Sequence, residues 1–248
     1  YRLVELASAV AAVAGALDDG PIVLVGHDWG APIVWNTATR HPDRVRAVAG
    51  LSVPHVPSSG TSIIDLLELL YADKFFYMLH FQEPGVAEAE FDADLRDALR
   101  RAYYATSGLA PLNSFLPDAP AGSAFLPLLP DPPDGPLPFL DDGELDRITA
   151  TFERTGMTGA FNRYRAARLD ALDDADILGA TVDQPSCFVG GEADPIRSMV
   201  PGGDLYGDPG GGCTDYRGTT IVPGAGHWVA REAPDQVNAA LDAFLDTL

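Results

Sequence analysis

The sequence is organised around the stretch Val25-Gly26-His27-Asp28-Trp29-Gly30. It follows the apolar run 22–25, which predicts a buried strand, and it precedes residues 31–38, which predict a helix with a proline in its first turn. Glycines on both sides of residue 28 give the spacing of the nucleophile elbow G-x-S-x-G, a sharp strand-to-helix turn with an exposed central side chain. The central residue here is aspartate. The stretch therefore holds either a carboxylate nucleophile or a tight turn with an exposed aspartate.

Aspartate at the centre of an elbow changes the chemistry that the turn supports. A serine must be activated by a base, whereas a carboxylate with a pKa of about 3.9 is already ionised at neutral pH. Such a carboxylate suits in-line attack on an sp3 carbon, which leaves an alkyl ester on the enzyme. The candidate substrates are therefore epoxides or compounds with carbon–halogen bonds.

Composition narrows the classes of function. The chain has 248 residues, 46% of them hydrophobic, and a net charge of −20, which argues against binding nucleic acid or anionic membranes. The sequence contains no run of 18 apolar residues, so it predicts no membrane-spanning helix. Cys187 and Cys213 form no ligand cluster with histidines, so we expect no metal and free thiols in a reducing, cytoplasmic compartment. Lys74 is the only lysine, a bias typical of GC-rich bacterial genomes.

The residues around the elbow predict alternating helices and strands. Residues 1–17 carry apolar side chains at helical spacing, and residues 45–53 give a second buried-strand pattern. Helix, strand, helix and strand in succession predict a parallel sheet with crossover connections. Strand signals return at 186–190 and 219–223, separated by a glycine-rich connection at 202–218 that we expect to be irregular, and residues 233–248 predict a closing helix.

The intervening stretch, 57–176, contains no strand signal. Helical patterns cover 63–76, 88–105, 142–154 and 159–172, and the proline-rich residues 116–140 predict a long loop. A helical block between the strands of one sheet predicts a cap over an α/β core. We therefore expect residues 1–56 and 177–248 to form the core and residues 57–176 to form the cap.

Two further polar residues follow predicted strands. Asp194 stands in G-G-E-A-D-P (190–195), and His227 stands in G-A-G-H-W (224–228). With Asp28 they give the chain order nucleophile, acid, base of α/β hydrolases. Because parallel strands end at one edge of a sheet, we expect the three side chains to meet there. Taken singly, Asp194 also fits a helix-capping loop residue, and His227 also fits a surface turn.

Five segments in the right order resemble the soluble epoxide hydrolases of the α/β-hydrolase superfamily. They are G-H-D-W-G-A-P (26–32), Tyr77, F-Q-E-P-G-V-A-E (81–88), N-R-Y-R (162–165) and G-H-W with E-A-P (226–234). The resemblance covers essentially the whole chain. It implies an α/β-hydrolase fold, a mostly parallel sheet with flanking helices and an inserted helical cap.

The resemblance also implies a role for each matching residue. Asp28 is the expected nucleophile, His227 the base, Asp194 its acid partner, Tyr77 and Tyr164 the cap tyrosines that bind the epoxide oxygen, and Trp29 an oxyanion-hole N–H donor. The expected partners are a small-molecule epoxide and water, and the expected product is a vicinal diol. The reaction requires no cofactor or metal. Each tyrosine taken alone also fits an amphipathic core residue.

One motif of the family has no counterpart here. The family carries H-G-x-P on a strand ahead of the elbow, and no H-G-x-P occurs in this sequence. We therefore expect the first strands to be missing and the strand at 22–25 to lie at an open edge of a sheet of about four strands. The side chains of Ile22 and Leu24 should then be less buried than in a central strand, and an open edge favours self-association.

Two other functions stay open. Haloalkane dehalogenases share the aspartate nucleophile and the histidine, and their elbow resembles this one closely, tryptophan included. They hold halide with tryptophan or asparagine donors of the cap or elbow, and not with two cap tyrosines. Tryptophan occurs here only at 29, 35 and 228, outside the predicted cap, which favours the epoxide. A non-catalytic binding protein on the same fold is the other alternative. The sequence does not decide the substrate's size, or between a monomer and a homodimer.

Overall fold

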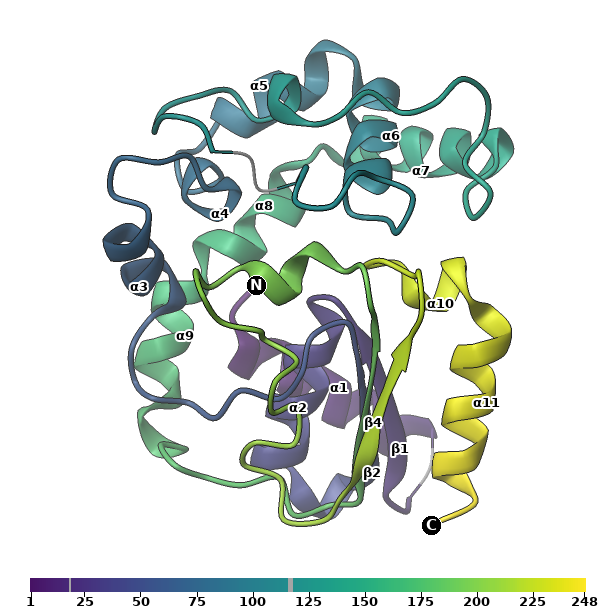
Figure 1. Cartoon of the computed structure of the whole chain (residues 1–248). Helices are drawn as coiled ribbons and strands as arrows, with labels where there is room; N and C mark the ends of the chain where they lie inside the picture. The colour runs from purple at the N-terminus through teal and green to yellow at the C-terminus, as the bar shows by residue number, and fades with distance from the viewer. Residues whose placement is uncertain (18, 116–117) are drawn as a thin grey trace.

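A parallel four-stranded sheet forms the centre of the computed structural model, which describes residues 1–17, 19–115 and 118–248 (Figure 1). The strands are β1 (Ile22–His27), β2 (Val45–Leu51), β3 (Ser186–Gly191) and β4 (Tyr216–Val222), paired in the order β1-β2-β3-β4. This architecture confirms the predicted α/β fold. All four strands end at the same edge of the sheet, so the residues that follow them are close in space.

Helices cover both faces of the sheet. One face carries α1 (Leu3–Leu17) and α2 (Gly30–Arg40), and the other carries α10 (Val229–Glu232) and α11 (Pro234–Leu245) (Figure 1). Leu24 packs with Trp35 of α2 in one apolar cluster. On the opposite face, Ala49 packs with Phe244 of α11.

Strand β1 lies at the edge of the four-stranded sheet, as predicted. Ile22 and Leu24 were both predicted to be less buried than in a central strand, and this is right only for Ile22. Ile22 is half-buried, whereas Leu24 is only 9% exposed, because it faces α2. The exposed side chain is Val25, at 49%, which points to the other face of the same strand. The alternation of side chains along a strand explains the difference.

The chain between β2 and β3 is helical and, in its described residues, contains no strand. Its helices are α3 (Ile63–Leu70), α4 (Tyr77–His80), α5 (Val86–Ala93), α6 (Leu95–Ala105), α7 (Asp142–Thr155), α8 (Thr158–Arg165) and α9 (Ala167–Asp173). The described residues of this stretch also hold the short 3-10 turns η2 (Leu126–Leu128) and η3 (Asp174–Asp176). The turns η1 (Pro42–Arg44) and η4 (Pro195–Ser198) lie outside it, before β2 and after β3. Helices α5, α6, α7 and α8 form a layer above the strand ends, and α3 and α9 lie beside the core (Figure 1). Within the described residues, no helix has the length and apolarity needed to span a membrane.

The helix predicted over 63–76 is shorter in the structure. Helix α3 ends at Leu70, and a new helix begins at Tyr77. Between them the chain leaves the helical path, because the N–H of Phe75 donates to the carbonyl of Ala119 at 2.7 Å. This long-range pairing has no local signal in the sequence.

Two other predicted helices are each divided in two. The pattern over 88–105 breaks at Asp94, whose carboxylate accepts the N–H of Asp97 at 3.1 Å and so caps α6. The pattern over 159–172 breaks at Ala166, between α8 and α9. Capping and turn geometry therefore interrupt helices whose apolar periodicity is continuous.

The proline-rich segment is a loop wherever it is described. Residues 116 and 117 lie outside the described residues. Within residues 118–140, the one helical element is the turn η2, and isolated β-bridges occur at Pro120 and between Leu137 and Leu140. The carboxylate of Glu90 accepts the N–H groups of Phe125 and Leu126 at 2.8 and 3.1 Å. This contact holds the loop over α5, so that it covers the cavity described below.

Candidate active site

The turn from β1 into α2 holds Asp28 in a left-handed backbone conformation, with φ +52°. A Cβ at Gly26 would lie 2.3 Å from the carbonyl oxygen of Gly30, so residue 26 must be glycine. A Cβ at Gly30 would meet no atom within 4 Å. Of the two glycines that give the sequence its elbow spacing, the geometry therefore requires only the one at position 26.

The structure brings together the three residues predicted as nucleophile, base and acid. His227 lies between the two carboxylates: its Nε2 is 3.0 Å from Asp28 Oδ2, and its Nδ1 is 3.0 Å from Asp194 Oδ2. The side chain of Asp194 is fully buried, and its Oδ1 accepts the N–H of Ile196 at 2.9 Å as it caps η4. Each of the three residues follows a different strand.

The charges of these groups depend on one another. Burial opposes the charged form of His227, but the carboxylates of Asp194 and Asp28 outweigh burial and raise the pKa of His227 to about 10. Burial also opposes the charged form of Asp28, but the hydrogen bond and the charge of His227 hold the pKa of Asp28 below its ordinary value. These two shifts favour an imidazolium at position 227 beside an ionised Asp28 carboxylate at neutral pH.

The two predicted cap tyrosines lie next to each other above Asp28. Tyr77 is the first residue of α4 and Tyr164 lies in α8, and their ring centroids are 6.0 Å apart at 81°. Burial raises the pKa of both hydroxyls, and the carboxylate of Asp28 raises it further. Both therefore stay protonated and able to donate a hydrogen bond.

A cavity of about 410 Å³ lies between the helical layer and the strand ends. Asp28, His227 and both tyrosines line it, and most of its remaining wall is aromatic. The aromatic lining comprises Trp29, Phe81, Phe91, Tyr103, Phe115, Phe125, Phe152, Phe161 and Trp228. The Asp28 carboxylate therefore faces a space suited to an apolar molecule with one polar reacting group.

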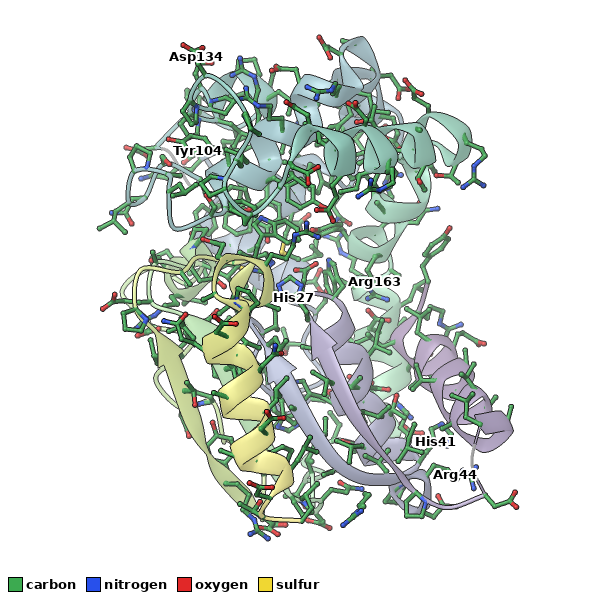
Figure 2. The ribbon with its side chains drawn as sticks, turned by 90° about the vertical axis from the view of Figure 1, so that its right-hand side faces the viewer. His27, His41, Arg44, Tyr104, Asp134 and Arg163 are labelled. Atoms are coloured by element: carbon green, nitrogen blue, oxygen red, sulfur yellow. The ribbon has the colours of Figure 1, made fainter. Side chains whose placement is uncertain are left out.

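Trp29 contacts the site through its backbone and through its ring. Its N–H donates to the Asp28 carboxylate and helps to lower the pKa of that group. The guanidinium of Arg163 lies 4.7 Å from the centroid of the Trp29 ring and also donates to Asp170 and to the carbonyl of Tyr1. Figure 2 shows Arg163 at the boundary between the helical layer and the core. Arg163 therefore fixes the ring beside the nucleophile.

Among the residues that the structure describes, three side chains that the sequence did not single out hydrogen-bond to Asp194 or His227. The Tyr206 hydroxyl lies 2.6 Å from Asp194 Oδ2. The Ser52 hydroxyl and the Nε2 of His27 each lie 2.7 Å from the carbonyl oxygen of His227. Tyr206 stands in the connection 202–218, where there is no periodic pattern, and an isolated tyrosine among glycines is its only signal.

The chain is similar to known epoxide hydrolases over nearly all of its length. A family model described as alpha/beta hydrolase fold matches residues 1–84. Epoxide hydrolase A of Mycobacterium tuberculosis is 38% identical over 244 residues, which cover 94% of this chain and 72% of that protein.

Solved structures agree with this similarity. Epoxide hydrolase A from Mycobacterium thermoresistibile is 38% identical with a TM-score of 0.89, and covers 99% of this chain and 76% of its own. An epoxide hydrolase from an endophytic Streptomyces is 35% identical with a TM-score of 0.91, over 99% of this chain and 74% of its own. This chain therefore belongs to the epoxide hydrolase family of enzymes with the α/β-hydrolase fold.

Proposed function

We propose that the protein hydrolyses epoxides to vicinal diols through an alkyl ester on Asp28. One observation carries the proposal: the Asp28 carboxylate lies on a strained elbow, 3.0 Å from His227 Nε2, and faces a cavity that Tyr77 and Tyr164 also line. An attacking carboxylate, two hydroxyl donors and a base therefore surround one apolar space.

In the first step, a carboxylate oxygen of Asp28 attacks one epoxide carbon as the bond from that carbon to the ring oxygen breaks. Tyr77 and Tyr164 hydrogen-bond the ring oxygen, and one of them gives it a proton. The resulting phenolate regains its proton from the imidazolium of His227. That transfer follows from charge: once Asp28 is an ester, it no longer stabilises the charged form of His227.

In the second step, neutral His227 takes a proton from water, and the hydroxide adds to the carbonyl carbon of the Asp28 ester. The N–H of Trp29, which already donates to the carboxylate, stabilises the oxyanion. As the tetrahedral intermediate collapses, the bond from the Asp28 carbonyl carbon to the diol oxygen breaks, and the diol oxygen takes the proton that the hydroxide brought. The Asp28 carboxylate is thereby restored next to the imidazolium. Epoxide and water are consumed and one diol is formed, so all protons balance.

The chain divides in this proposal into a core of residues 1–56 and 177–248 and a cap of residues 57–176. The core supplies Asp28, His227 and Asp194, and the cap supplies both tyrosines and most of the aromatic wall. We place the enzyme in the cytoplasm, because Cys187 and Cys213 are both free thiols. Size-exclusion chromatography with light scattering decides between a monomer and a homodimer.

Haloalkane dehalogenation is the second candidate, because it uses the same nucleophile. The Nε1 of Trp228, which lines the cavity, lies 2.8 Å from Thr106 Oγ1 and 3.1 Å from the carbonyl of Tyr103. Its single N–H is thus already engaged and unsuited to a halide. Trp29 lines the same cavity, and its ring N–H donates to the Tyr164 hydroxyl. Because both of these tryptophan donors are engaged, the two tyrosines favour an epoxide.

A single turnover in water labelled with 18O, with enzyme in excess, tests the ester intermediate. Hydroxide adds to the ester carbonyl, so the label should enter the Asp28 carboxylate and the first diol should carry none. Asp28→Asn should lose turnover, and Asp43→Asn, a change of an exposed aspartate of η1, should retain it.

Label in the first diol contradicts the ester, and halide release without epoxide turnover favours the dehalogenase. A bound epoxide that is never converted favours the non-catalytic relative.

A further inference from the structure

Tyr206 is a buried tyrosine whose hydroxyl reaches the back of the site. It lies 2.6 Å from Asp194 Oδ2 and 2.8 Å from the carbonyl oxygen of Ser52. The ring packs against Phe188 with centroids 4.7 Å apart, and a Cβ at Gly190 would lie 2.5 Å from it. Glycine at position 190 therefore leaves room for a tightly held ring, which fixes the position of the hydroxyl.

Ser52 connects Tyr206 to the other end of His227. It follows β2 in a left-handed conformation, φ +63°, and its hydroxyl donates to the carbonyl of His227 at 2.7 Å. The Nε2 of His27, at the end of β1 below the helical layer (Figure 2), donates to the same carbonyl at 2.7 Å. The Tyr206 hydroxyl has one proton and both of its neighbours are acceptors, so it donates to the closer Asp194 Oδ2 and only touches the carbonyl oxygen of Ser52. With that contact included, a ring of contacts runs from Asp194 through Tyr206, Ser52 and His227 back to Asp194.

We propose that Tyr206 and Ser52 are positioning residues that hold His227 in place for the hydrolysis of the ester. The proposal rests on the function proposed above. In the resting site, His227 is also held by the Asp28 carboxylate. That carboxylate becomes a neutral ester after ring opening, so the contacts through Asp194 and Ser52 remain to orient the imidazole. Removing them should slow the second step far more than the first.

Tyr206 also adjusts the charge that His227 experiences. Its hydroxyl donates to the oxygen of Asp194 that accepts His227 Nδ1–H, and so withdraws negative charge from that oxygen. Without this donor, the imidazolium is held more strongly and gives up its proton at higher pH. The titratable groups that contact His227 directly are Asp28, His27 and Asp194. Tyr206 acts on His227 through Asp194, and Glu232 accepts the N–H of Gly226, the residue before His227.

Tyr206→Phe removes the hydroxyl and keeps the ring, and Ser52→Gly removes the other hydroxyl with a residue suited to a positive φ. Rapid mixing with a chromogenic epoxide, followed by the fluorescence of Trp29 and Trp228 in the cavity, gives separate rates for ester formation and ester hydrolysis. In each variant, the rate of ester hydrolysis should fall by about 10-fold, which is the lower end of the losses seen when the hydrogen-bond partners that orient metal-binding histidines are removed. Ester formation should stay within about two-fold.

Matched controls separate positioning from general damage. Tyr216→Phe removes a hydroxyl that contacts Thr219 at the surface, and Ser186→Ala removes a hydroxyl from the interior of β3. Both should leave the two rates unchanged. In Tyr206→Phe, the hydrolysis rate should also reach its plateau at higher pH than in the unmodified protein, an effect that a purely structural role would not produce.

Equal slowing of both steps, or an unchanged hydrolysis rate with an unchanged pH profile, overturns the proposal. If Tyr206→Phe does not fold, Ser52→Gly tests the same ring independently. The His227→Gln variant separates this outcome from a failure of the proposed function. If His227→Gln accumulates the ester while Tyr206→Phe and Ser52→Gly behave normally, the mechanism stands and only the positioning role is wrong.

Discussion

The geometry of the site depends on two neighbouring residues of the elbow, Gly26 and Asp28. A non-glycine residue with positive φ costs about 1–3 kcal/mol and persists where its surroundings enforce it. The surroundings here are the close approach of Gly26 to the start of α2. This approach turns the chain sharply and presents the carboxylate to the cavity.

A matched pair of alanine substitutions tests this geometry. Gly26→Ala should distort the elbow, because its Cβ would lie 2.3 Å from a backbone oxygen, and should cost about 1–3 kcal/mol of stability and nearly all turnover. Gly30→Ala, whose Cβ meets nothing within 4 Å, should be neutral. Urea unfolding and initial rates measure both. Equal effects of the two substitutions contradict the steric explanation.

His227 should matter most after the ester has formed. His227→Gln cannot take a proton from water, so the ester should persist and mass spectrometry should find Asp28 heavier by the mass of the substrate. Ring opening should slow less, because the Asp28 carboxylate needs no base. His41→Gln, a change of a partly buried histidine far from the cavity (Figure 2), is the control. A His227→Gln enzyme with normal turnover and no adduct refutes the assignment.

The two tyrosines should share the stabilisation of the ring oxygen. Tyr77→Phe and Tyr164→Phe each remove one hydroxyl at little change in volume, and each should slow ring opening by about 10²–10³-fold. The double variant should be nearly inactive. Tyr104→Phe, a change of a tyrosine on α6 away from the cavity lining, is the control. Full activity in both single variants makes the dehalogenase the better assignment.

At the scale of helices and strands, the sequence predicted those site residues that directly follow a recognisable strand pattern. Asp28, Asp194 and His227 could be predicted to meet because each follows a strand of a parallel sheet, and parallel strands end together. The breaks at Asp94 and Ala166 were not predictable from periodicity, because capping and turns act over a few residues. Tyr206 could not be predicted, because its partners are distant in sequence.

Glu88 joins two helices of the helical layer. Its carboxylate accepts two hydrogen bonds, at 2.7 and 2.9 Å, from the guanidinium of Arg165 on α8, and accepts the N–H of Gly85 at the start of α5. Tyr164 directly precedes Arg165 on α8. The pair therefore ties the helix that carries a predicted proton donor to the rest of the layer.

Glu88→Gln should destabilise the protein in a pH-dependent way. The hydrogen bonds from Arg165 lower the pKa of Glu88 from 4.5 to about 2, so its contribution is complete above pH 4.5 and is lost as the pH falls towards 2. In urea, the free energy of unfolding of Glu88→Gln should be about 1.5–3 kcal/mol lower than that of the unmodified protein at pH 6. This deficit should shrink below pH 4.5. Glu153→Gln, at an exposed site on α7, should show none. A deficit that is constant with pH contradicts this reading.

At the scale of the whole molecule, charge repulsion opposes folding. The chain carries a net charge of −20, and charges of one sign repel most strongly when the chain is compact. Most ion pairs have an exposed partner, such as those of Arg96 with Asp142 and Asp146, and contribute little each. Repulsion summed over the surface should therefore outweigh these pairs at low salt.

Raising sodium chloride from about 10 to 300 mM should accordingly raise the melting temperature. The screening length falls from about 30 Å to below 10 Å over this range. A gain of about 1–2 kcal/mol in the free energy of unfolding corresponds to roughly 2–8 °C in a protein of this size. Asp92→Lys with Glu153→Lys, both at exposed sites, takes the net charge from −20 to about −16, because each exchange changes it by two. This variant should melt higher than the unmodified protein at low salt and nearly equally at high salt. A melting temperature that falls as salt is added means that ion pairs, and not net charge, dominate the electrostatics of the fold.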